Sequence, residues 1–308
     1  MRVLLTGHQG YLGTVMAPIL TAAGHEVVGL DSGLFADSVL GPQPADPPGV
    51  RVDLRDITPE HVAGVDAVIH LAALSNDPLG SLAPELTYDI NHHASVRLAK
   101  LARDAGVRRF LYASTCSVYG ASGGDGLVTE DAPLRPVTPY AESKVRVEDD
   151  VHALADGDFT PVFMRNATAF GYSPRLRADI ARAFTAALTA PREAVHDRAF
   201  NIGSEINNVT VAEIADQVAE AVAGAKVVIT GENGADPRSY RVDFSRFRNA
   251  IPGFDCEWTV KQGALELADA YRKFDLTREA FEQRFTRLAV LRAATDAGTV
   301  DDTLRWRR

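Results

Sequence analysis

Cysteine is scarce in this chain, and neither a long apolar run nor an excess of basic charge is present. The 308 residues include two cysteines, Cys116 and Cys256, with no C-x-x-C pair, which argues against a disulfide framework or a zinc site and for free thiols. No apolar run approaches the ~18 residues of a membrane span, and no basic leader precedes the first apolar segment. The formal net charge of −9 disfavours nucleic acid and anionic membranes as partners. We therefore expect a cytoplasmic protein.

Apolar residues make up 46% of the chain, enough to bury a core in one large domain or two modest ones. Over the first half, short apolar segments alternate with amphipathic ones. We expect strands at residues 2–6, 26–30, 50–54, 67–71, 109–113 and 160–165. We expect helices from residue 10 to about 23, over 85–105 and from 139. This alternation predicts an α/β fold with a doubly wound, Rossmann-type parallel sheet.

Three glycines after the first expected strand carry the most specific signal. Gly7 permits a tight turn, Gly10 lets backbone amides approach a pyrophosphate, and Gly13 lets the following helix pack closely. The N-terminus of that helix adds unpaired N–H groups and a positive dipole end. Asp31, eighteen residues beyond Gly13, can accept both hydroxyls of a ribose and would repel an extra phosphate there. This order of elements predicts a dinucleotide site for NAD rather than NADP: a strand, a glycine turn, a helix, a second strand and an acidic residue.

The alternation loosens beyond Arg165. Helical segments are expected at residues 180–190, 210–222 and 260–274 and in the tail from 277, with extended chain at 199–202 and a strand at 226–229. We therefore divide the chain into an NAD-binding Rossmann domain over 1–165 and a smaller substrate-binding region over 166–308. Some crossing of the chain back to the first domain is expected.

Tyr140 and Lys144 lie four positions apart on one expected helix and therefore share a face. A free tyrosine has a pKa of about 10, so lowering it to about 7 takes about 4 kcal/mol of phenolate stabilisation. The Lys144 ammonium and the positive nicotinamide ring of NAD⁺ can supply it, which would make Tyr140 a general base. Thr115, at the end of the preceding strand, is placed to polarise the same substrate oxygen. The alternatives are a solvated lysine beside an amphipathic tyrosine, and a threonine that bonds its own backbone.

Together these motifs resemble the extended short-chain dehydrogenases/reductases of the NAD-dependent epimerase/dehydratase family, which act on nucleotide sugars. The resemblance covers nearly the whole chain and is most specific through Tyr172. It implies that Thr115, Tyr140 and Lys144 form the catalytic set. The implied cofactor contacts are Gly7, Gly10, Tyr11 and Leu12 at the pyrophosphate with Gly13 beside them, Asp31 and Ser32 at the adenine ribose, Asp53 and Leu54 at the adenine, Leu71, Ala72 and Ala73 at the middle of the cofactor, and Tyr140 and Lys144 at its nicotinamide end.

The two positions after Thr115 bear on the reaction. Sugar 4,6-dehydratases of this family carry an Asp-Glu pair there, because eliminating water across carbons 5 and 6 needs an acid and a base. This chain has Cys116 and Ser117 instead, which fits the epimerases better. In these, the tyrosine takes a proton from the sugar 4-hydroxyl while hydride passes to NAD⁺, and the hydride returns to the opposite face of the 4-keto intermediate. Cys116 fits a packing residue better than a nucleophile, because no histidine partner is evident.

The resemblance also implies a set of substrate contacts. These candidates are Cys116, Ser117, Asn166, Thr168, Arg175 and Arg238. Thr168 aligns with an asparagine of the family, unless Asn166 takes that role, and Arg238 resembles an arginine that meets the substrate diphosphate. The resemblance also implies a lid segment of about 30 residues between positions equivalent to 177 and 179, which this chain lacks.

The leading hypothesis is an NAD-dependent epimerase that acts on a nucleotide sugar. A second is an NAD-dependent sugar dehydratase or reductase with an unusual substrate, suited to the shortened lid. A third is a non-catalytic NAD-binding protein that has lost its substrate site. By resemblance we expect a homodimer that pairs through residues 85–105 and 139–155.

Overall fold

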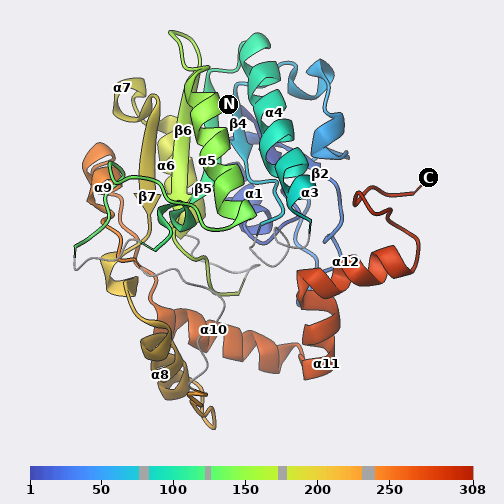
Figure 1. Ribbon diagram of the computed structural model, residues 1–308, viewed down its shortest axis with the longest axis vertical. Coiled ribbons are helices and arrows are strands. Elements are labelled where there is room, and N and C mark those ends of the chain that lie inside the picture. The colour runs from blue at the N-terminus through green and yellow to red at the C-terminus, as the bar shows by residue number, and fades with distance from the viewer. Residues whose placement is uncertain (76–82, 122–125, 173–178, 231–239, 308) are drawn as a thin grey trace.

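A seven-stranded parallel sheet forms the centre of the molecule (Figure 1), described by a computed structural model over residues 1–75, 83–121, 126–172, 179–230 and 240–307. The strands are β1 (Arg2–Thr6), β2 (Glu26–Asp31), β3 (Gly49–Arg51), β4 (Ala67–His70), β5 (Arg109–Thr115), β6 (Thr160–Asn166) and β7 (Arg198–Ile202). Their order is β3-β2-β1-β4-β5-β6-β7 and every adjacent pair is parallel. The direction of winding reverses between β1 and β4, which confirms the predicted doubly wound α/β fold and places a crevice at the carboxyl ends of these strands.

Helices connect the strands and continue into the C-terminal part of the chain. They are α1 (Gly13–Ala22), α3 (Pro84–Thr87), α4 (Ala94–Asp104), α5 (Pro139–His152), α6 (Asp179–Thr189), α7 (Arg192–Val195), α8 (Val211–Ala221), α9 (Ser245–Ala250), α10 (Val260–Lys273), α11 (Arg278–Ala280) and α12 (Arg287–Asp296). A π-helical stretch, Tyr88–His93, joins α3 to α4, so the long helix expected over 85–105 is present with a bulge. Helix α5 begins as predicted, with Pro139 in its first turn and the Thr138 hydroxyl accepting the Ala141 N–H.

Two apolar cores lie on opposite faces of the sheet. Alternate residues of β1 show the division, since Val3 and Leu5 belong to one core and Leu4 to the other. The first core packs α1 and α6 against the sheet, and the second packs α4 and α5 (Figure 1). Strands buried on both faces present apolar residues continuously, which is why the sequence shows runs rather than alternation.

Most expected strands agree with the structure to within two residues, and two differ more. β3 ends at Arg51 rather than 54, because the Asp53 carboxylate accepts the Arg55 N–H and starts a short 3₁₀ turn, Leu54–Asp56. The strand expected over 226–229 is wrong: this segment has no regular structure, and Val228 and Ile229 are 79% and 81% exposed. An extended segment without a neighbouring strand leaves its backbone groups to water.

The sheet continues past the expected domain boundary at Arg165, because β7 pairs with β6. The division into 1–165 and 166–308 stays a prediction. None of the helices in the described ranges is long and apolar enough to cross a membrane.

Candidate active site

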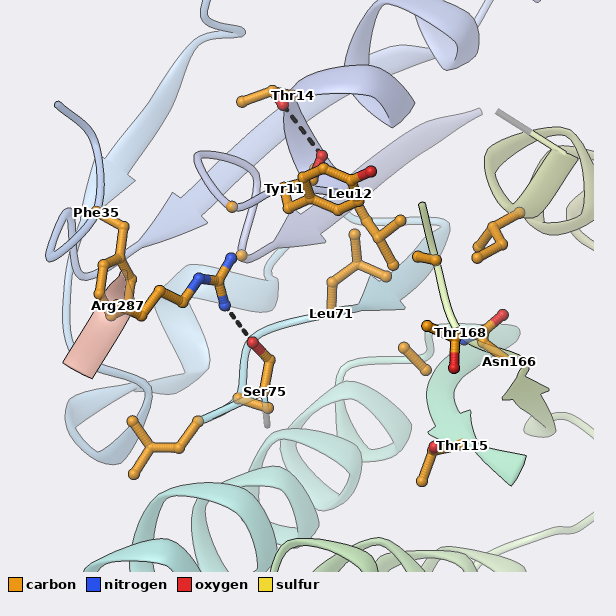
Figure 2. Close-up of a pocket in the computed structure, with 18 of the residues that line it drawn as sticks. Tyr11, Leu12, Thr14, Phe35, Leu71, Ser75, Thr115, Asn166, Thr168 and Arg287 are labelled. Carbon is orange, nitrogen blue, oxygen red and sulfur yellow. Dashed lines mark hydrogen bonds between the residues drawn. The ribbon is translucent and has the colours of Figure 1, made fainter. Parts of the chain in front are cut away.

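A cleft of about 1400 Å³ opens at the carboxyl edge of the sheet, where the winding reverses. Most small-molecule pockets measure about 300–1,000 Å³, so this cleft has room for more than one small ligand. Its wall includes residues from the ends of β1, β2, β4, β5 and β6 and from the C-terminal part of the chain. Figure 2 shows Thr115, Asn166 and Thr168 at one end of the cleft and Phe35, Ser75 and Arg287 at the other.

The glycine turn lies at the floor of this cleft. Gly7 has a φ of +74°, which favours glycine, and a Cβ there would lie 2.8 Å from the Ala72 nitrogen. A Cβ on Gly13 would lie 2.2 Å from the Gly7 carbonyl oxygen, so only glycine lets α1 start this close to the turn. Gly10 closes the turn by donating its N–H to the Gly7 carbonyl over 3.0 Å. The turn therefore has the shape that the spacing predicts.

Asp31 ends β2 at the adenosine side of the predicted site. Its carboxylate accepts the backbone N–H groups of Gly33 (2.8 Å) and Gln9 (3.1 Å), which fix its direction. A carboxylate has about four lone-pair positions, so two remain for ribose hydroxyls. Asp53 pairs with Arg55 over 2.6 Å. Burial alone would raise the pKa of Asp53, but the hydrogen bonds from Arg55 lower it overall.

Tyr140 and Lys144 lie together on α5, as their spacing predicts. The Lys144 Nζ is 5.7 Å from the Tyr140 ring centre and 4.7 Å from that of Tyr112. It donates a hydrogen bond to the Ala113 carbonyl over 2.7 Å. Lys144 is 3% exposed, so the alternative of a solvated lysine is wrong.

Burial is the main cause of the pKa shifts of Lys144 and His70, near the Tyr140 end of the cleft. It lowers the pKa of Lys144 to about 7, against a smaller opposing effect of the Glu148 carboxylate. Burial, and secondarily the Lys144 charge, lowers the pKa of His70 to about 3. His70 is therefore neutral at pH 7, and its ring lies between the hydroxyls of Thr6 (2.6 Å) and Ser95 (2.7 Å). Lys144 therefore exchanges its proton near neutral pH.

Polar side chains from β5 and β6 complete this end. The Thr115 oxygen accepts the Ser117 N–H over 3.1 Å, so the backbone contact that we weighed as its alternative role exists and leaves the hydroxyl hydrogen available to donate. Asn166 donates its amide to the Ser114 carbonyl over 3.2 Å, while its buried Oδ1 finds no hydrogen-bond partner among the described residues. Ser117 and Thr168 also line the cleft. The unsatisfied Asn166 oxygen is an acceptor for a donor on a ligand.

One of the expected substrate contacts, Cys116, does not line the cleft, and two others cannot be placed because they lie outside the described residues. Cys116 is 1% exposed, and its thiol points away from the cleft to donate to the Arg165 carbonyl over 3.1 Å. Burial raises the pKa of this thiol, so it stays protonated and serves packing. A substrate contact for Cys116 is therefore wrong. Arg175, Arg238 and the lid junction at 177–179 lie wholly or partly outside the described residues.

A buried ion pair lies beneath the strand β5, which carries Thr115. The Glu148 carboxylate binds Arg165 (2.6 Å) and accepts the Ser114 hydroxyl (2.5 Å), which lies next to Thr115. Arg165 also donates to the Tyr119 hydroxyl over 3.0 Å. This network couples α5, β5 and β6, the elements that carry the predicted catalytic set.

The contribution of the C-terminal part of the chain to this cleft was not predicted from the sequence. Arg287, at the start of α12, and Leu304 both line it, together with Phe35 and Ser75. No local motif marks these residues, since they reach the cleft only through the tertiary fold. All the residues that we expected at the cofactor line the cleft: Gly7, Gly10, Tyr11, Leu12, Gly13, Asp31, Ser32, Asp53, Leu54, Leu71, Ala72, Ala73, Tyr140 and Lys144.

These residues fit NAD. The glycine turn leaves no space for a Cβ at Gly7 or Gly13, and the Asp31 carboxylate is held by two backbone donors with further acceptor positions available. Fold and site together define an extended short-chain dehydrogenase/reductase. A sequence model described as the NAD dependent epimerase/dehydratase family matches residues 3–178, more than half of the chain. The chain belongs to this family, and NAD is the family's cofactor.

Among known proteins, the chain is similar to two curated UDP-glucose 4-epimerases. One, from Streptomyces lividans, is 35% identical over 154 residues, which is 48% of this chain and 45% of that protein. Another, from Mycolicibacterium smegmatis, is 31% identical over 234 residues, 72% of this chain and 73% of that protein. For several such relatives, including the first, the matched part spans slightly less than half of their length.

A solved structure extends the likeness of the fold over most of the chain. It is the NAD dependent NDP-hexosamine 5,6-dehydratase TunA, at 22% identity and a TM-score of 0.76, covering 88% of this chain and 98% of that one. At this identity the likeness shows the fold alone.

Proposed function

We propose that this protein is an NAD-dependent epimerase that inverts carbon 4 of a nucleotide sugar through a transient ketone. The observation that supports this most is the grouping of Tyr140, Lys144 and Thr115 at one end of a cleft that fits NAD. The similarity to curated UDP-glucose 4-epimerases makes a nucleotide sugar the substrate class to test first.

NAD⁺, held by the glycine turn, Asp31 and Lys144, would supply the acceptor, and later the donor, of the hydride of carbon 4. Tyr140, as the phenolate, takes the proton of the sugar 4-hydroxyl. Lys144 is a nearby cation and therefore stabilises that phenolate. The phenolate in turn stabilises the charged form of Lys144, whose pKa burial has lowered. Thr115 donates its hydroxyl hydrogen to the reacting oxygen, while the Ser117 N–H fixes the threonine oxygen.

The surroundings of Thr115 favour epimerisation over elimination of water. A 4,6-elimination needs an acid and a base beside the threonine, and the next residue, Cys116, is buried with its thiol held by the Arg165 carbonyl. Burial raises the pKa of that thiol, which makes it a poor base. Ser117 lines the cleft, but an ordinary hydroxyl has too high a pKa to act as that base.

The test is product analysis after incubation of the purified protein with UDP-, dTDP- and GDP-sugars. We expect one of them to be converted to its 4-epimer with no net formation of NADH. A product lighter by one water would support the alternative of a sugar dehydratase, and accumulation of NADH or NAD⁺ would support a dehydrogenase or reductase. Binding of NAD with no conversion of any sugar in the panel would support the non-catalytic alternative.

We also propose a homodimer that pairs through residues 85–105, which include α4, and 139–155, which include α5, and we propose a cytoplasmic location. Helices α4 and α5 cover one face of the sheet side by side (Figure 1), and the outer face of α5 carries polar residues such as Arg146 and Asp150. Light scattering on the purified protein would give the mass of a dimer, and a monomer at micromolar concentration would refute the pairing. Cell fractionation tests the location.

A further inference from the structure

The C-terminal segment, residues 277–307, folds back over the adenosine end of the NAD cleft. From α10 it runs to the side of the molecule that carries β2 and α3 (Figure 1). There Leu291 and Leu304 join Leu74, from the loop after β4, in a small buried apolar cluster. Partly buried residues around this cluster are Leu34, Phe35, Leu86, Ile90 and Leu288. The segment therefore packs on the loops after β2 and β4, which also line the cleft.

Polar contacts fix the end of this segment. The Trp306 indole donates to the Ser32 carbonyl over 2.8 Å, and the Arg51 guanidinium lies 4.3 Å from the centre of the Trp306 ring. Arg305 forms an ion pair with Asp56. Ser32 directly follows Asp31, so the segment is anchored beside the predicted adenine-ribose contact.

Arg287, the first residue of α12, reaches from this segment into the cleft. Its guanidinium donates to the Ser75 hydroxyl and lies 5.0 Å from the Phe35 ring centre (Figure 2). The stack on Phe35 and the bond to Ser75 hold the planar group in one orientation. A guanidinium has five N–H donors, so this contact leaves others for a ligand.

Charged groups from both ends of the cofactor site act on the Arg287 guanidinium. Burial lowers the pKa of its guanidinium, and Asp31 at the adenosine end and Tyr140 at the nicotinamide end act in the opposite direction. Lys144, Arg241 and Arg287 are the basic side chains among the described residues that line the cleft. Lys144 bonds to the Ala113 carbonyl at the nicotinamide end, and Arg241 is largely exposed. Of these three, Arg287 is therefore the side chain that we expect beside the two phosphates.

We propose that Arg287 is a cofactor-binding residue that pairs with the pyrophosphate of NAD, and that the C-terminal segment holds it there. The glycine turn offers backbone N–H groups to the phosphates from one side, and Arg287 supplies a positive charge from the other. A planar guanidinium can make two parallel hydrogen bonds to phosphate oxygens. The inference depends on NAD as the cofactor and not on the epimerase reaction, so binding measurements test it whatever the turnover.

The test is isothermal titration calorimetry of the full-length protein, freed of bound nucleotide, with NAD, ADP and adenosine as separate probes. Arg287→Gln should weaken NAD and ADP about ten- to hundredfold, the range for a hydrogen bond to a charged group. Adenosine has no phosphates and should bind as it does to the wild type. Arg287→Lys keeps the positive charge but not the pair of parallel N–H donors, and it should lose less affinity for NAD and ADP than Arg287→Gln.

Arg292→Gln, at an exposed position on the same helix, is the matched control and should bind all three probes as the wild type does. Circular dichroism checks that each variant is folded. If Arg287→Gln does not fold, the affinities of Arg287→Lys for NAD, ADP and adenosine test the proposal in its place. Equal losses for adenosine and NAD would show that Arg287 only shapes the cleft and would overturn the proposal. Unchanged NAD binding would overturn it too, and so would tighter binding, which would mean that the side chain obstructs the cofactor.

Discussion

Replacing Lys144 by methionine should remove a pH dependence that the wild-type protein shows in its free energy of unfolding between pH 7 and pH 9. In the folded, cofactor-free protein, burial lowers the pKa of Lys144 to about 7. An unfolded lysine has a pKa of about 10.4, so between these values the unfolded state binds more protons and stability rises with pH. The two pKa values give an increase of about 2 kcal/mol from pH 7 to pH 9.

Urea unfolding followed by circular dichroism at both pH values measures this difference. Lys100→Met, at an exposed position on α4, is the matched control and should keep the pH dependence of the wild type. Other titrating groups are common to all three proteins and cancel in the comparison. If the Lys144→Met and wild-type proteins gain or lose the same stability between pH 7 and pH 9, the lysine titrates as if in water and the electrostatic account of the site is wrong.

Two further predictions concern the frame of the site. Glu148→Ala should destabilise the protein by about 3–5 kcal/mol, because it leaves the buried Arg165 guanidinium without its partner at 2.6 Å. The double variant Glu148→Ala with Arg165→Met should recover part of that loss in denaturant unfolding, and no recovery would argue against the pair. Gly13→Ala should weaken NAD binding in calorimetry and lower stability, because its Cβ would lie 2.2 Å from the Gly7 oxygen. Gly157→Ala, with no atom within 4 Å of its Cβ, is the control, and equal NAD affinity in the two variants would contradict the prediction.

Local sequence patterns were sufficient for the nucleotide-binding half of the fold. The glycine spacing predicts the turn at Gly7 because the positive φ of +74° that the turn needs is a local property of the backbone that glycine favours. The four-residue separation of Tyr140 and Lys144 predicts their shared helix face, because helix geometry fixes it. Apolar runs predict strands buried on both faces, and the winding order follows from right-handed crossovers.

Features that depend on contacts distant in sequence could not be predicted in this way. Cys116 follows Thr115 at the end of β5, but a short 3₁₀ turn directs its thiol to the Arg165 carbonyl on β6. Arg287 reaches the cleft from a segment more than 100 residues beyond the last strand-end motif, and no pattern around it indicates a ligand. The strand expected over 226–229 failed for a related reason, because an apolar run forms a strand only where a neighbouring strand can pair with it.

The central claim is that this cleft removes a hydride from a sugar carbon and returns it to the same carbon with Tyr140 as the base. The most direct measurement is the conversion of a nucleotide sugar that carries deuterium on carbon 4, with products analysed by mass spectrometry. We expect the wild-type protein to invert that carbon and keep the deuterium, and Tyr140→Phe to bind NAD but give no product. Tyr88→Phe, outside the cleft, should behave as the wild type. Exchange of the deuterium for solvent hydrogen during inversion, or full turnover by Tyr140→Phe, would contradict the account.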